Sequence, residues 1–167
     1  MFEGASIEQH KLAPSDEDIR AGLHKEMEQG AHWFFWIAGL SLVNTGISAF
    51  GGDWNFVLGL AYTMVVDEMA AEAGAAGTFI PVLTSVFIAG IFILFGLQAK
   101  KKHRWPFFAG MTLYLIDGLI FVLAQVWLAV AIHGLALYYL YKGVSALNQL
   151  RKMETVTVPG LSQVKLD

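Results

Sequence analysis

Apolar residues gather in four long blocks, and short polar or charged stretches separate them. The blocks cover 31–50, 79–99, 106–124 and 127–147. Twenty residues of α-helix rise about 30 Å, which is the thickness of the hydrocarbon core of a bilayer. The pattern predicts an all-α fold, an integral membrane bundle of four transmembrane helices.

The last two blocks belong to one apolar stretch of 35 residues, from Phe107 to Tyr141. A helix of that length would rise about 52 Å, too far for one crossing. The stretch therefore predicts a tight helical hairpin, and we place its turn at residues 124–127.

A fifth stretch, 56–73, is the ambiguous one. Its apolar part is short, and acidic residues follow it. This length is more typical of a re-entrant or interfacial helix than of a span. If the stretch does cross, the bundle has five spans.

Polar segments flank the bundle at 1–30 and 148–167. In the first, Ser15 followed three residues later by Asp18 predicts a helix N-terminus. Ile19, Leu23 and Met27 then form an apolar stripe. This short amphipathic helix lies along the bundle or docks a partner.

The distribution of Lys and Arg between the spans predicts which side of the membrane each segment faces. With four spans, all 11 Lys and Arg residues lie on one side; with five, the best division is 8 against 3. Because cationic loops stay in the cytoplasm, the four-span arrangement is favoured. It predicts that both termini lie on the cytoplasmic side of the membrane.

Composition agrees with this assignment. Hydrophobic residues make up 56% of the chain and charged residues 15%, and the mean hydropathy is +0.53. Soluble domains carry fewer apolar and more charged residues. The absence of cysteine excludes a disulfide scaffold or a thiolate metal site.

Several polar residues fall inside the apolar blocks. Asp117 and His133 each lie eight residues from Gln125 in the expected turn, so a hairpin brings them to one depth. We expect the carboxylate to orient an imidazole N–H. With these two, the residues of an intramembrane polar cluster are Asn44, Thr84, Ser85, Asp117 and His133.

This cluster has three interpretations. Interhelical hydrogen bonds can simply hold the bundle in register. Buried titratable groups also suit a proton or ion site. A metal, haem or pigment held by His133 is the third and is not favoured, since a metal would need a further ligand such as Asp67 or Glu68.

Two charged groups lie outside the blocks. The acidic outer segment consists of Asp53, Asp67, Glu68 and Glu72. It is a solvated face or a mouth that collects cations. The cationic loop consists of Lys100, Lys101, Lys102 and Arg104, and its position beside a span predicts binding to lipid headgroups rather than to nucleic acid.

Four short stretches resemble a family of small, uncharacterised bacterial inner-membrane proteins. They are 53–60 (DWNFVLGL), 103–105 (HRW), 114–121 (YLIDGLIF) and 133–134 (HG). The likeness covers about 33–147. It implies a bacterial membrane setting and attaches no activity.

The sequence contains no catalytic motif, nucleotide-binding loop or metal-ligand spacing. We therefore expect a non-enzymatic accessory or scaffold subunit of a larger membrane complex, whose partners are the lipid bilayer and other membrane subunits or further copies. The alternatives are a small oligomeric proton- or cation-conducting protein and an intramembrane hydrolase or metalloenzyme. For association, we expect the N-terminal stripe, the tail, and lipid-facing Phe34, Phe95 and Phe121 to supply contacts.

Overall fold

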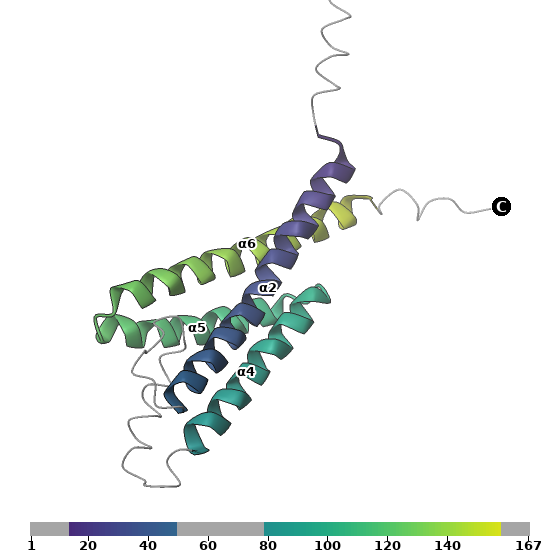
Figure 1. The fold of residues 1–167 in the computed structure, drawn as a ribbon. Coiled ribbons are helices and arrows are strands. Elements are labelled where there is room, and N and C mark those ends of the chain that lie inside the picture. The colour runs from purple at the N-terminus through teal and green to yellow at the C-terminus, as the bar shows by residue number, and fades with distance from the viewer. Residues whose placement is uncertain (1–13, 50–78, 158–167) are drawn as a thin grey trace, which may run out of the picture.

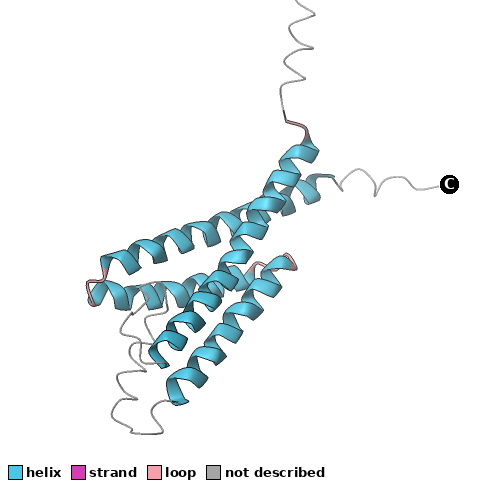
Figure 2. Cartoon of the chain, in the orientation of Figure 1, coloured by secondary structure: helices cyan, strands magenta, loops and turns pink. Residues whose placement is uncertain are grey.

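The computed structural model describes residues 14–49 and 79–157. Over these ranges the chain forms four α-helices and no strand: α2 (Asp16–Ala49), α4 (Phe79–Lys100), α5 (Trp105–Leu123) and α6 (Trp127–Thr157). The prediction of an all-α fold with four helices is confirmed (Figure 2). The predicted helix at 56–73 and the acidic outer segment lie outside the described residues.

Helix α2 begins where the sequence predicts. The Ser15 side-chain oxygen accepts a hydrogen bond from the Asp18 backbone N–H at 3.1 Å, and the Ser15 N–H donates to Asp18 Oδ2 at 3.1 Å. This reciprocal pair is a capping box, which satisfies amides that have no partner inside the helix. The Ser15 hydroxyl, which donates to Asp18 Oδ2 at 2.6 Å, and the Ser15 N–H hold the pKa of Asp18 below its usual value, because they stabilise the carboxylate.

The same helix then continues without a break to Ala49. The sequence predicts an N-terminal amphipathic helix and a separate first span, whereas in the structure both belong to one helix. Within the predicted stripe, Met27 is buried, Leu23 packs against the core and Ile19 is exposed. Most of the stripe therefore serves this chain's own packing.

The predicted turn at 124–127 joins α5 and α6. Gln125 adopts a left-handed conformation with φ of 58°, and the Val126 N–H donates to the Phe121 carbonyl at 3.0 Å. This is the arrangement that ends many helices, and glycine usually occupies the left-handed position. Lys102, just after α4, has the same conformation, with φ of 63°.

The helices form two pairs that diverge from one end (Figure 1). Helix α2 lies beside α4, and α5 lies beside α6. Both pairs meet at the end that holds the cationic loop between α4 and α5, and α2 also packs against α6 there. The structure is thus held together mainly at the basic end.

An aromatic cluster fills this junction. The Phe34 ring lies 5.9 Å from that of Phe95 and 5.7 Å from that of Phe107, measured between centroids, and all three side chains are buried. Phe121 is buried as well. The prediction that Phe34, Phe95 and Phe121 face lipid is wrong, because these rings fill the space between the helices.

Helices α2 and α6 cross at two glycines. A Cβ atom added to Gly30 would lie 2.6 Å from the Gly143 Cα and 3.0 Å from the Tyr139 carbonyl oxygen. One added to Gly143 would lie 2.8 Å from the Gly30 Cα. The backbones are therefore in direct contact, as small residues allow in membrane bundles.

Two of the described helices are long and apolar enough to cross a membrane, over Val82–Lys100 and Trp105–Leu123. Only 33% and 39% of the residues in these stretches are buried. Large apolar side chains face outward on both, such as Phe87 and Leu123, which are 70% and 83% exposed. A core helix of a soluble protein would bury them, so this surface supports a membrane location.

Candidate functional site

The hairpin brings Asp117 of α5 and His133 of α6 together. Asp117 Oδ2 lies 3.0 Å from His133 Nε2, and both side chains are buried. The contact predicted from the equal spacing about Gln125 is confirmed. Burying a polar pair costs free energy unless its groups are hydrogen-bonded, and this contact supplies such a bond.

The imidazole is fixed on several sides. His133 Nδ1 lies 2.9 Å from the Ala129 carbonyl oxygen, one turn earlier in α6. The ring stacks on Tyr114 with centroids 4.2 Å apart and planes inclined by 11°, and Phe121 lies at 5.1 Å. A Cβ atom at Gly118 would come within 3.1 Å of the ring, so the glycine makes room for the histidine.

These contacts determine how many protons the pair holds. A carbonyl oxygen only accepts, so the bond to Ala129 requires a hydrogen on His133 Nδ1. The contact between Nε2 and Asp117 then needs one more proton, carried by either residue. With the proton on Asp117, both side chains are neutral; with it on His133, an imidazolium faces a carboxylate.

The expectation of a carboxylate that orients an imidazole N–H is therefore met only in the charged form. In the neutral form Asp117 is the donor and Nε2 accepts.

Both ring nitrogens of His133 are engaged in hydrogen bonds, and ligation of haem or a metal would require the loss of one of these bonds. Among the residues that the structure describes, no group of three His, Asp or Glu is placed to hold a metal.

The remaining members of the predicted cluster lie in the other helix pair. The Thr45 hydroxyl oxygen lies 2.7 Å from Ser85 Oγ and 3.1 Å from the Ser41 carbonyl oxygen, and the hydrogen bond to Ser85 links α2 with α4. Thr84 donates to the carbonyl of Ile80 in its own helix. Ser41 Oγ and Asn44 Oδ1 are buried and have no hydrogen-bond partner among residues 14–49 and 79–157. The described hydrogen bonds thus place the predicted polar layer in two helix pairs.

Residues of the predicted polar tail contact the cationic loop. Helix α6 continues to Thr157, and its Arg151 donates to the Lys102 carbonyl at 2.8 Å. Arg104 donates to Asn148 Oδ1 at 3.1 Å. Lys100 and Lys101 are exposed, and the Lys100 ammonium lies 5.0 Å from the Phe35 ring centroid. Helix α6 therefore holds the loop in place by hydrogen bonds, and the Lys100 and Lys101 side chains are exposed.

Sequence reasoning missed the two glycines of the helix crossing, Gly30 and Gly143. Close small residues on two helices are a usable signal only when their pairing is known. Comparisons of the chain with protein-family models, with curated proteins and with solved structures find no match. The resemblance to a family of small bacterial inner-membrane proteins stays a prediction.

Proposed function

We propose that this protein is a non-enzymatic integral membrane protein that acts as an accessory or scaffold subunit of a larger membrane complex. It crosses the bacterial inner membrane four times, with both termini and the cationic loop on the cytoplasmic side. The observation that supports this role best is a projection built by the packed ends of α2 and α6 at the basic end of the bundle.

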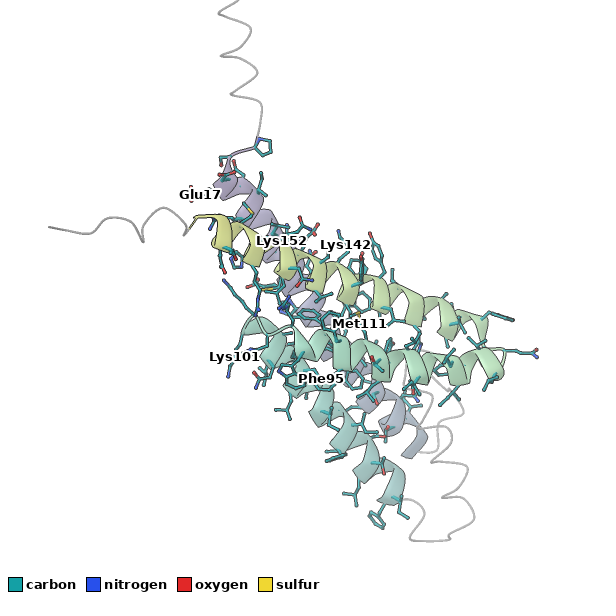
Figure 3. The ribbon with its side chains drawn as sticks, turned by 180° about the vertical axis from the view of Figure 1, so that it is seen from behind. Glu17, Phe95, Lys101, Met111, Lys142 and Lys152 are labelled. Atoms are coloured by element: carbon teal, nitrogen blue, oxygen red, sulfur yellow. The ribbon has the colours of Figure 1, made fainter. Side chains whose placement is uncertain are left out.

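This projection, the α2–α6 arm, consists of residues 16–30 and 142–157. Figure 3 shows Glu17 and Lys152 on its two helices, beyond the level of Lys101. Fifteen residues of α2 extend about 22 Å. The two helices pack together through buried Met27, Leu147 and Leu150, and Lys142 Nζ lies 3.0 Å from Glu26 Oε1.

The arm is too polar to lie in the membrane. Its outer positions carry exposed charges of both signs: Glu17, Lys25, Glu28, Lys152 and Glu154. These charges lie outside the apolar blocks at 31–50 and 127–147, so they are not required for crossing. Two helices already ordered against each other bind a partner with a smaller loss of conformational entropy than a flexible tail would.

The role of the Asp117–His133 pair follows from its geometry. The pair is buried and joins α5 to α6. These properties suit an interhelical hydrogen bond that fixes the register of the hairpin. The pair then stabilises the scaffold and is not a site of chemistry.

A charge reversal on the arm tests the proposal. In Glu17→Lys/Glu28→Lys, two exposed acids become bases, so the purified chain keeps its thermal stability while partner binding is lost. Native electrophoresis of membranes expressing the chain at its own level should show a stoichiometric assembly for the wild type. The variant should run mostly as the free chain.

Lys101→Gln, an exposed change outside the arm, should leave the assembly intact. The conducting alternative is tested with the purified chain in vesicles, where we expect no proton or cation flux. Robust flux that Asp117→Asn abolishes and the arm variant keeps would contradict the accessory role.

The topology makes a separate prediction, and the absence of native cysteine allows clean labelling. Cysteine at Ala124, in the hairpin turn, should react with an impermeant maleimide from outside. Cysteine at Lys101 should react only after permeabilisation. Cysteines at Asp53 and Gly77 should both label from outside; labelling from opposite sides would mean that 56–73 crosses and that the chain has five spans.

A further inference from the structure

An open groove lies between α2 and α6 at the base of the arm. It is lined by Gln29, His32, Trp33, Trp36 and Tyr139. The Trp33 and Tyr139 rings stack with centroids 5.0 Å apart and planes inclined by 14°. These two side chains are partly buried and form the inner wall, whereas the other three are exposed and form the rim.

The lining changes from polar to apolar along α2. Gln29 and His32 come first, on the side of the arm, and Trp36 lies one turn beyond His32 toward the bundle. A phospholipid at a membrane surface has the same order, with a polar headgroup outside and acyl chains inside. Tryptophan and tyrosine side chains prefer this interfacial depth.

The donors of the lining suit an anionic group. None of the five lining residues is acidic. Of the two acids that precede them on α2, Glu26 is paired with Lys142 and Glu28 is exposed to solvent. The Gln29 amide and the His32 imidazole can both donate hydrogen bonds, and a phosphate group offers several acceptor oxygens.

We propose that this groove binds one phospholipid molecule from the leaflet that meets the arm. Its phosphate accepts hydrogen bonds from Gln29 and His32, and the first part of an acyl chain packs against Trp36 and Trp33. The lipid thereby fills the surface between α2 and α6 just beyond the Gly30–Gly143 contact. This inference rests on the membrane setting of the proposed function and goes beyond the accessory role.

Native mass spectrometry of the delipidated full chain in detergent tests the site. Titration with phosphatidylglycerol should show one molecule retained per chain. Trp36→Ala should weaken this binding about tenfold, since the loss of one buried aromatic contact is worth roughly 1.4 kcal/mol or more. Trp36 is 64% exposed, so the fold should be unaffected.

Trp127→Ala is the matched control, because Trp127 is 67% exposed and lies at the hairpin end. It should retain the lipid as the wild type does. Diacylglycerol, which lacks the phosphate, should bind more weakly, and His32→Ala should reduce that preference. Equal loss in both tryptophan variants, equal binding of diacylglycerol, or displacement of the lipid by inorganic phosphate would overturn the proposal. Cysteine labelling reports insertion independently, so a failed lipid site and a failed membrane assignment remain distinguishable.

Discussion

Replacing Gly30 with leucine is expected to separate α2 from α6 and to lower the free energy of unfolding by about 3 kcal/mol. Even the first added carbon would lie 2.6 Å from the Gly143 Cα. The obstacle is backbone on the opposite helix, which cannot rotate away as a side chain can. Relief requires the helices to move apart, and the arm and the aromatic cluster would both lose contacts.

Unfolding in bicelles, followed by circular dichroism during titration with a denaturing detergent, measures this effect. Gly39→Leu is the matched control on the same helix, because no atom lies within 4 Å of a Cβ at that position. It should leave stability unchanged or raise it, since leucine favours helix more than glycine does. Equal destabilisation by both variants would show that the Gly30–Gly143 contact does not hold the helices together.

Truncating Asp117 or His133 alone is expected to cost about 3 kcal/mol of unfolding free energy, because the buried survivor loses the hydrogen bond between the two residues. Removing both side chains should cost clearly less than the sum of the two single changes. A double-mutant cycle with Asp117→Ala and His133→Ala in bicelles measures this coupling. Additive effects would mean that the 3.0 Å contact contributes no stabilising interaction.

The variant Asp117→Asn tests, in the same assay, which residue of the pair carries the proton between them. With Nδ1 bound to the Ala129 carbonyl, a neutral imidazole presents a lone pair on Nε2, and the asparagine amide can donate to it. This variant should therefore be much milder than Asp117→Ala. If the two were equally destabilising, the pair would require the charge on Asp117, and the ion-pair form would be the native one.

Much of the helical arrangement could be predicted from the sequence. The bounds of α5 and the start of α6 follow from the long apolar stretch and from Trp105-Pro106, since proline is tolerated in the first turn of a helix. The end of α6 at Thr157 lies beyond the predicted 147. The Asp117–His133 contact follows from arithmetic, because equal spacing about a tight turn brings residues of antiparallel helices to one level. Both inferences depend only on distance along the chain.

The rotation of each helix about its axis could not be predicted. Phe34, Phe95 and Phe121 occur in helices that are apolar on every side, so the pattern did not distinguish the face toward lipid from the face toward the core. The continuity of α2 was missed because hydropathy changes near Gly30 although the helix does not end. The Gly30–Gly143 contact was missed because it depends on which helices become neighbours.

The unbroken length of α2 gives the Gly30 crossing a mechanical consequence. About 21 Å of helix lies on the Asp16 side of the Gly30 crossing and about 29 Å on the Ala49 side. A tilt imposed on the arm therefore moves the far end of α2 about 1.4 times as far in the opposite direction, since a helix of this kind bends little. The Thr45–Ser85 hydrogen bond lies near that far end. A load that tilted α2 about the Gly30 crossing would therefore reach a polar contact between α2 and α4.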